Sequence, residues 1–230
     1  MTIEPIAYFH SHFPTKFGVP RQSGIINELR GYIIFEPKYR VREALRGLEG
    51  YDYIWLIWEF SANRKDDESW HATVRPPLLG GNKAVGLFAT RSPFRPNPLG
   101  LSSVKIERID FENKNAPVIY VLGADLMDGT PIYDIKPYVE YADSHVDVRS
   151  GFVDDYEWEL LDVDFPSNLL ERISVDMRRS LIKVLELDPR PQYKDDKEKV
   201  YGMSYGGFDI RFKVSDRILT VVDVVKLQPA

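Results

Sequence analysis

The chain of 230 residues contains no cysteine. A disulfide framework, a thiolate metal site and a cysteine nucleophile are therefore excluded. Long hydrophobic runs are also missing, since the longest one, residues 54–58, is far too short to span a bilayer. The first residues have neither a basic start nor an apolar stretch. We therefore expect no signal peptide, no membrane anchor and a cytoplasmic protein.

Three common site motifs are absent as well. The sequence has no G-x-x-x-x-G-K-[ST] phosphate loop, no strand-linked G-x-G-x-x-G and no G-x-S-x-G turn. A P-loop nucleotidase, a Rossmann dinucleotide site and a hydrolase nucleophile elbow are thus excluded. His10 and His12 can share one face of a strand, but no carboxylate accompanies them at metal-ligand spacing. We interpret them as solvated or hydrogen-bonding residues and expect no metal ion.

Acidic residues are missing from one long window, residues 70–105. This window holds five cations on a chain whose net charge is −5. A basic, proline- and glycine-rich patch on an acidic body favours a localised anionic partner. The competing interpretation is that the acidic residues cluster elsewhere by chance.

What the sequence does contain is typical of a globular, mainly β protein. It is 43% hydrophobic and 28% charged, with 16 Pro and 15 Gly, which excludes disordered, collagen-like and coiled-coil chains. Short runs rich in β-branched and aromatic residues are bounded by turn residues, and they predict strands at 3–9, 31–36, 51–60, 84–89, 101–109, 118–125 and 130–135. Their short, irregular spacing favours a β-barrel over residues 1–150.

The character of the chain changes near residue 150, and residues 151–230 predict a smaller α+β domain. We expect a strand over 156–162 and a helix over 167–186 that begins with Ser167 as its N-cap. A hairpin of strands 208–214 and 217–227 should turn at residues 215–216. One further helix is predicted over 40–47, within the barrel region.

The densest chemical signal lies in residues 85–100, where a strand enters a loop that has three prolines within six residues. Because proline fixes φ, this loop is stiff and suits a preorganised site. Arg91 and Arg95, four residues apart, favour an anion or ligand contact. The alternative is a rigid barrel corner with solvated arginines.

Two more turns carry polar residues that a plain loop does not require. One is the proline-started segment 20–24 between strands. The other is 126–138, in which Asp-Gly signals a hairpin but Asp134 and Lys136 interrupt an apolar strand.

Taken together, these segments resemble the TsaA-like, YaeB-type family of tRNA methyltransferases, the TrmO family. The matching pieces run in the family's order from about residue 3 to 227 and are PRQ (20–22), VRPP (74–77) with GGN (80–82), FATRS (88–92) with FRPNP (94–98), DGTP (128–131) with DIKPY (134–138), and DPRP (188–191) with Tyr193. Any single piece is weak, but five in order over the whole chain are specific.

The resemblance implies a non-Rossmann β-barrel methyltransferase that uses S-adenosylmethionine and acts as a homodimer. It implies methylation of the 6-amino nitrogen of threonylcarbamoyladenosine, beside the anticodon of threonine tRNA. It also implies cofactor contacts at Pro20, Arg21, Gln22, Phe60, Ser61, Arg91, Leu101, Ile132, Tyr133, Asp134 and Ile135. Relatives can carry a histidine where Ser61 stands.

The chemistry of methyl transfer to this nitrogen adds further expectations. The carbamoyl group makes the nitrogen a poor nucleophile but its proton easier to remove, so we expect a general base. Asp128 and Asp134 are the candidates, and turn capping explains Asp128 equally well. We assign Arg91 to the cofactor carboxylate.

The basic window then serves the RNA. We expect Arg75, Lys83 and Arg95 to hold anticodon-loop phosphates, and Arg190 and Tyr193 to complete the RNA groove. Two other functions stay open: a non-catalytic RNA-binding barrel, and an S-adenosylmethionine-dependent methyltransferase of small molecules.

Overall fold

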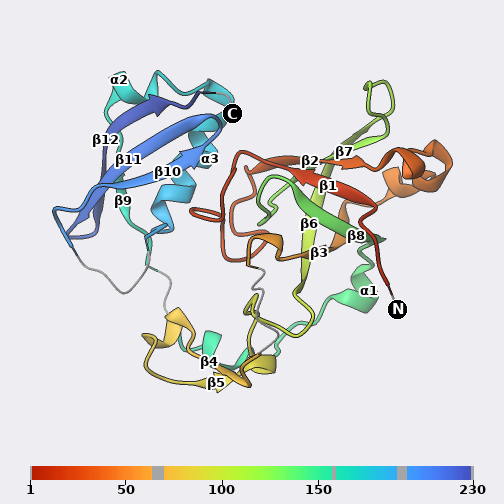
Figure 1. Cartoon of the computed structure of the whole chain (residues 1–230), viewed down its shortest axis with the longest axis horizontal. Coiled ribbons are helices and arrows are strands. Elements are labelled where there is room, and N and C mark those ends of the chain that lie inside the picture. Colours follow the sequence, from red (N-terminus) through yellow and green to blue (C-terminus); the bar gives the residue numbers. More distant parts are fainter. Residues whose placement is uncertain (1, 64–69, 157–158, 191–195, 229–230) are drawn as a thin grey trace.

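The structure, a computed structural model, describes residues 2–63, 70–156, 159–190 and 196–228. Its larger part is a closed six-stranded barrel with the strand order β1-β2-β7-β6-β3-β8 (Figure 1). Every neighbouring pair is antiparallel. The barrel strands are β1 (Ala7–His10), β2 (Arg30–Phe35), β3 (Tyr53–Glu59), β6 (Leu99–Asp110), β7 (Val118–Leu122) and β8 (Thr130–Pro137).

Alternation of side chains fills the barrel. In β3, Ile54, Leu56 and Trp58 are buried in the barrel interior, while Tyr53, the first residue of the strand, is 41% exposed. Successive strand residues point to opposite faces, so one apolar set per strand is enough to build the core. Gly100 lies opposite Trp58, where an added Cβ would come within 2.3 Å of the indole ring. Glycine there lets the indole lie across β6.

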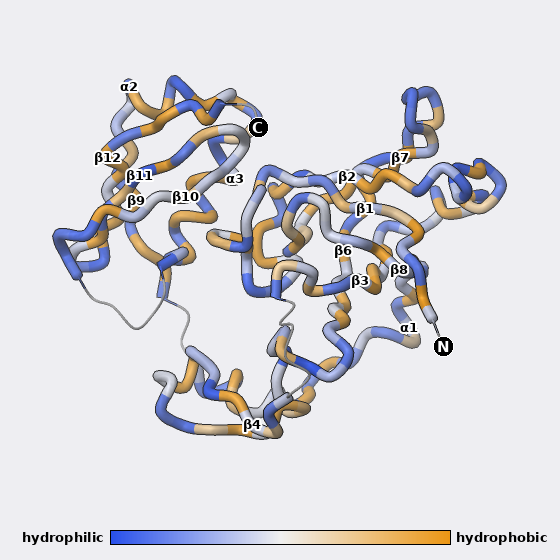
Figure 2. Tube along the Cα trace, in the orientation of Figure 1, coloured by the Kyte–Doolittle hydropathy of each residue, from blue (hydrophilic) through white to orange (hydrophobic). Residues whose placement is uncertain are grey.

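A second core belongs to the C-terminal sheet, whose strand order is β10-β11-β12-β9. The sheet strands are β9 (Asp162–Asp164), β10 (Tyr201–Tyr205), β11 (Phe208–Ser215) and β12 (Ile218–Lys226). Two helices accompany it, α2 (Ser167–Leu170) and α3 (Val175–Glu186). Figure 2 shows hydrophobic stretches along these elements and hydrophilic residues at the turn between β11 and β12.

The segment that joins β1 to β2 is part of this second core. Phe13, Ile26 and Leu29 are buried together with Leu181 of α3 and Phe212 of β11. Hydrophobic contact therefore connects the N-terminal barrel region to the C-terminal sheet. A domain boundary near residue 150 stays a prediction. The segment between β1 and β2 precedes that boundary in the sequence but packs in the core of the C-terminal sheet.

A third, smaller unit projects away from both cores between β3 and β6 (Figure 1). It contains the two-stranded sheet of β4 (Thr73–Val74) and β5 (Val85–Gly86). We call residues 70–98 the basic excursion. The remaining short elements are α1 (Glu140–Asp143) and the 3₁₀ turns Pro37–Tyr39, Arg42–Leu45, Leu48–Gly50, Ser61–Asn63, Pro77–Leu79, Leu87–Ala89 and Gly151–Val153.

Mainly β architecture, the barrel and the smaller C-terminal sheet domain are confirmed, but one helix prediction is wrong and a second needs correction. Residues 40–47 form the 3₁₀ turn Arg42–Leu45, and Gly47 adopts the left-handed conformation at φ 89°. Only Leu45 of this segment is buried in the core, so no apolar face stabilises a full helix. The helical region predicted over 167–186 has the expected ends, but it is interrupted at Ser174, which is extended at ψ 143°. Ser167 is the first helical residue rather than the N-cap, which is Pro166, and no side-chain hydrogen bond caps this helix.

Three strand predictions also need correction. Of residues 84–89, only Val85–Gly86 is a strand, and it pairs with β4 rather than with the barrel. The strand expected over 156–162 is Asp162–Asp164, parallel to β12, and residues 157–158 lie outside the described part of the chain. The last hairpin turns one residue later than predicted, because Asp216 and Arg217 both have positive φ.

No helix in the described part of the chain is long and apolar enough to cross a membrane. Within that part there is also no cluster of three or more histidine, aspartate or glutamate residues that fits a metal ion. His10 and His12 diverge: His10 stacks on Tyr32 with ring centroids 5.0 Å apart, whereas His12 lies 5.3 Å from Tyr205 of the C-terminal sheet.

The position of His12 predicts acid sensitivity of this junction. Burial lowers its pKa, and nearby Asp176 opposes that shift. The unfolded chain therefore takes up the proton first as the pH falls below 6.5, and the folded state loses stability there. We expect His12→Gln to flatten the decline in unfolding free energy between pH 7.5 and 5.5, measured by urea denaturation.

The exposed His145 provides the control. His145→Gln should leave the decline as it is in the unmodified protein. Equal slopes for the His12 variant and the unmodified protein would contradict the assignment.

Candidate active site

Strand direction brings three long connections to one end of the barrel. β1, β3 and β7 run in the same direction, because each is separated from the next by one antiparallel neighbour. Their outgoing segments, residues 11–29, 60–98 and 123–129, therefore leave from the same end (Figure 1). These segments carry most of the family residues, and β6 and β8 begin beside them.

The first contact at this end joins two expected cofactor residues. The Arg91 guanidinium donates a short hydrogen bond from Nη1 to Oε1 of Gln22. Arg91 is exposed and Gln22 is partly exposed, so both remain open to a ligand. The two residues are 69 positions apart in the chain, and the fold brings them together.

A buried hydrogen-bond chain lies next to this pair. The indole Nε1 of Trp58 donates to Ser102 Oγ at 2.9 Å, and Ser102 Oγ donates to Asp125 Oδ1 at 2.6 Å. Burial raises the pKa of the Asp125 carboxyl, while hydrogen bonds from Ser102 and from the backbone N–H groups of Asp125 and Ser23, and the charge of Arg91, lower it. The sequence prediction missed Asp125, which it placed at the end of an ordinary strand. A carboxylate in an apolar strand was the available signal.

Aromatic and apolar surface completes this end. Phe60 packs on Trp58 with ring centroids 4.3 Å apart, and its backbone N–H donates to Pro98 O at 2.9 Å. Leu101 is 59% exposed on β6, directly after Gly100. Ser61 begins a short 3₁₀ turn beside Phe60. Gln22, Phe60, Leu101 and Arg91 thus surround the Asp125 region with a cation, an amide and apolar groups.

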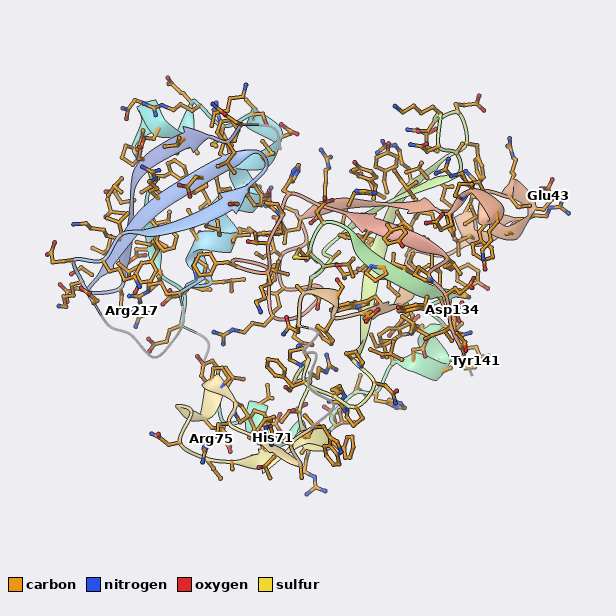
Figure 3. The ribbon with its side chains drawn as sticks, in the orientation of Figure 1. Glu43, His71, Arg75, Asp134, Tyr141 and Arg217 are labelled. Carbon is orange, nitrogen blue, oxygen red and sulfur yellow. The ribbon has the colours of Figure 1, made fainter. Side chains whose placement is uncertain are left out.

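The β8 residues divide between different surroundings. Ile132 is fully buried in the barrel core, so its side chain faces away from any surface site. Tyr133 donates a short hydrogen bond to the buried carboxylate of Glu59. Asp134 forms an ion pair with Lys136 at 3.0 Å, and Ile135 packs at the edge of the core. Figure 3 shows Asp134 on the barrel, well apart from Arg75.

The carboxylate of Asp128 has a capping role in the structure. Its Oδ1 accepts hydrogen bonds from the Ser11 backbone N–H at 3.1 Å and lies 3.1 Å from His10 Nδ1. This arrangement fastens the end of β1 to the β7–β8 connection, and it agrees with the turn-capping interpretation. The side chain is 44% exposed and is therefore accessible to a substrate. A catalytic role for Asp128 stays a prediction.

The residues expected to bind RNA lie in two places. Arg75 and Lys83 are exposed on the basic excursion, where Figure 3 shows Arg75 near His71. Arg95 is half-buried: its Nη1 donates to Thr90 O at 2.8 Å, and its guanidinium lies 5.6 Å from the Phe88 ring centroid. It therefore braces the loop as well as adding charge.

Exposed aromatic residues accompany these cations and were not singled out in the sequence. Phe88 is 71% exposed and Trp70 51%, with ring centroids 6.0 Å apart. The absence of acidic residues from 70–105 predicted the charge of the basic excursion. The exposure of its aromatic residues was not predicted, because it follows from the separation of the basic excursion from both cores. Cations next to open ring faces are typical of single-stranded RNA surfaces.

The C-terminal residues behave differently. Arg190 is held by Asp188 through two hydrogen bonds of 2.8 Å, which offset its charge locally. It lines a groove of about 220 Å³ together with Arg21, so the structure brings one expected tRNA residue and one expected cofactor residue to a common groove. Tyr193 lies outside the described residues.

The closed β-barrel, with a cation, an amide and aromatic groups at one end, agrees with the non-Rossmann methyltransferase that the family resemblance implies. Comparison with known proteins identifies the family. The tRNA-methyltransferase O N-terminal domain matches residues 8–144, and the TrmO C-terminal domain matches residues 159–227. The chain belongs to the TrmO family of S-adenosylmethionine-dependent tRNA methyltransferases.

Individual relatives agree with this assignment. The chain is 34% identical over 221 residues to tRNA (adenine(37)-N6)-methyltransferase of Escherichia coli, covering 93% of both chains. It is 35% identical over 218 residues to a Pseudomonas aeruginosa protein described as "Putative S-adenosylmethionine-dependent methyltransferase RcsF", covering 92% of this chain and 91% of that protein. A crystal structure of TrmO from P. aeruginosa superposes with a TM-score of 0.78 at 29% identity, covering 98% and 97%.

Proposed function

We propose that this chain transfers a methyl group from S-adenosylmethionine to the 6-amino nitrogen of threonylcarbamoyladenosine beside the anticodon of threonine tRNA. The E. coli relative is named as acting on the N6 position of adenine 37, which supports this position and this atom. The observation that carries the proposal is the Gln22–Arg91 contact at the barrel end, because it joins two distant family segments into one exposed polar site.

The groups at this end fit the methyl donor. S-adenosylmethionine supplies an electrophilic methyl group on a positively charged sulfonium. Arg91 is the exposed cation for its carboxylate, and Gln22 holds that guanidinium in place. The face of Phe60, which packs on the buried Trp58, suits a cation, and Leu101 provides open apolar surface for a purine. Pro20, Arg21, Ser61 and residues 133–135 remain in the proposed donor site, whereas the buried side chain of Ile132 faces the barrel core.

Transfer requires alignment and loss of one proton. The accepting nitrogen must lie about 3–3.5 Å from the methyl carbon, so the rigid barrel end contributes by orientation. Asp128 and Asp134 are the proposed general bases. Both carboxylates are about half exposed, at 44% and 45%, and both already accept hydrogen bonds within the chain. A substrate N–H that approaches either one meets an oriented acceptor.

The basic excursion is the proposed RNA surface. Arg75, Lys83 and Arg95 supply charge for the anticodon-loop phosphates, and Phe88 supplies a ring for an unstacked base. Arg190 and Tyr193 extend the surface toward the C-terminal sheet in this proposal.

A homodimer is part of the same proposal. Large apolar side chains outside the proposed donor site are exposed on the barrel, including Tyr51 and Tyr53 at 41% and Tyr32 at 38%. Surfaces of this kind are characteristic of association sites. Light scattering on the purified protein measures the association state directly, and a monomer at all concentrations would remove this part.

Mass spectrometry of tRNA nucleosides tests the proposed reaction. A deletion strain should lose the methylated threonylcarbamoyladenosine, and the complemented strain should regain it. Binding of tRNA without transfer of labelled methyl groups in vitro would indicate a non-catalytic RNA-binding protein instead. Turnover of a small molecule without tRNA would indicate the other alternative.

Removal of Arg91 should weaken donor binding selectively. A charge-assisted hydrogen bond contributes about 1.5–3 kcal/mol, so Arg91→Ala should raise the dissociation constant of S-adenosylmethionine by at least about tenfold. Because Arg91 is exposed, the melting temperature should change little. Isothermal titration calorimetry measures the affinity. Arg211→Ala, on the C-terminal sheet, is the control, and an affinity change below about twofold in Arg91→Ala would remove Arg91 from the donor site.

Removal of Lys83 should change the salt dependence of tRNA binding. One lost phosphate contact reduces the slope of log K against log salt by about 0.7–0.9. Lys83→Ala is cleaner than Arg95→Ala, because Arg95 also braces the loop. Filter binding at several salt concentrations measures the slope. Lys114→Ala, in the loop at the opposite end of the barrel, should leave it unchanged. An unchanged slope for Lys83→Ala would exclude this residue from the RNA surface.

A further inference from the structure

Asp125 is the point where three separate segments of the barrel end meet. The backbone N–H of Ser23, one residue after Gln22, lies near its carboxylate and favours the charged form. The carboxylate accepts a hydrogen bond from Ser102 Oγ at 2.6 Å, one residue after Leu101. It also attracts the positive charge of Arg91. One segment therefore hydrogen-bonds to Asp125 directly, and the other two place a backbone N–H and a positive charge near the same carboxylate.

We infer that Asp125 is a positioning residue of the methyl-donor site, which holds the 20–24 loop and the Arg91 guanidinium in the geometry that binds the donor. This inference rests on the proposed function for the identity of the donor. Asp125 acts through Ser23, Ser102 and Arg91, and no role in moving a proton is assigned to it.

The backbone contacts around Asp125 show that the fold has other fastenings for the same loop. Gly24 N donates to Gly123 O at 2.8 Å, and Gly123 N donates to Leu29 O at 2.8 Å. Ile26 and Leu29 are in addition buried in the second core. The chain path from residue 24 onward is therefore set without the carboxylate. Phe17 and Val19 also pack against the second core, so the part of the loop that these contacts leave unfastened is residues 20–23, which include Gln22.

The cost of burying this carboxylate also indicates a role beyond stability. Burial is the largest influence on Asp125 and disfavours its charged form. A buried carboxylate with a neutral surrounding is destabilising unless it is paired. At Asp125 the compensating groups are two backbone N–H groups, a serine hydroxyl and Arg91. Of these, only Arg91 requires a negative charge rather than a neutral acceptor.

The hydrogen-bond chain behind Asp125 restricts its rotation. Ser102 Oγ donates its single proton to Asp125 and accepts from Trp58 Nε1 at 2.9 Å, so both roles of the hydroxyl are used. Gly100 permits the position of that indole, since a Cβ would clash with it. The core of the barrel thus orients Ser102, and Ser102 orients the carboxylate toward Ser23 and Arg91.

The test compares Asp125→Asn with the unmodified protein in three measurements. Calorimetry should show that the dissociation constant of S-adenosylmethionine rises at least about tenfold, because the acceptor that orients Arg91 loses its charge. The KM for the donor should rise with it, while kcat and the dissociation constant of tRNA stay within about threefold. Hydrogen exchange of the ligand-free protein should become faster at the amide of Ser23, but not at residues 26–29.

Ser102 variants separate orientation from mere packing. Ser102→Ala removes the donor to Asp125 and should weaken donor binding, whereas Ser102→Thr keeps a hydroxyl and should restore it. Asp110→Asn is the matched control, because the Asp110 carboxylate also accepts two backbone N–H groups, those of Glu112 and Asn113, in a loop at the other end of the barrel. This control should leave donor affinity unchanged.

The outcomes distinguish this inference from the proposed function. A donor affinity in Asp125→Asn equal to that of the unmodified protein, or a loss of affinity accompanied by faster exchange throughout both cores, would overturn the positioning role. An unmodified protein that binds the donor but leaves tRNA unmethylated would overturn the proposed reaction. In that case the loss of donor binding in Asp125→Asn would still support the inference.

Discussion

Closure of the barrel by antiparallel pairing is the constraint on which the rest of the structure depends. Once β1, β3 and β7 must run in one direction, their outgoing connections emerge at one end. Those connections contain the motifs of the family, which are separated by up to about a hundred residues in the chain. A barrel with its core filled by side chains offers no interior cavity for a ligand of this size, so the site forms at the rim. The paired strands of the closed barrel hold this polar end in place. We call this end of the barrel, with Gln22, Arg91 and Leu101, the rim.

The connection between β1 and β2 has two roles in this arrangement. Its first part carries Gln22 to the rim, where it meets Arg91. Its remainder buries Phe13, Ile26 and Leu29 in the core of the C-terminal sheet. The cofactor loop is therefore fixed from both sides, and the C-terminal sheet lies close to the proposed donor site. The groove shared by Arg21 and Arg190 is a direct consequence.

Local pattern was sufficient for the barrel strands and the last hairpin, but not for the strands expected over 84–89 and 156–162 or for the helix expected over 40–47. Alternating apolar residues in 51–60 and 208–226 predicted strands that the structure confirms, because every second side chain of a half-buried strand faces the core. The segment 40–47 has helical spacing but only Leu45 reaches the core, and spacing alone says nothing about what a helix packs against. The helical spacing of 167–186 likewise does not reveal the break at Ser174, which follows the buried residue Ile173.

The candidate site was predictable only where residues carry a local signal. The acid-free window and the three prolines identified the basic excursion, and resemblance identified Gln22 and Arg91. Asp125 was missed because its importance depends on Ser23 and Ser102, which are distant in the sequence and become neighbours only when the barrel closes. Burial of a carboxylate is a property of the fold, and the sequence around residue 125 does not contain it.

The most direct test of the rim site is a crystal structure of the protein with S-adenosylhomocysteine, the product of the methyl donor. The account predicts electron density for the carboxylate of this ligand at Arg91, with its purine against the surface of Leu101 and Phe60. Density in a different part of the molecule, with the rim residues unchanged and water between Gln22 and Leu101, would contradict it.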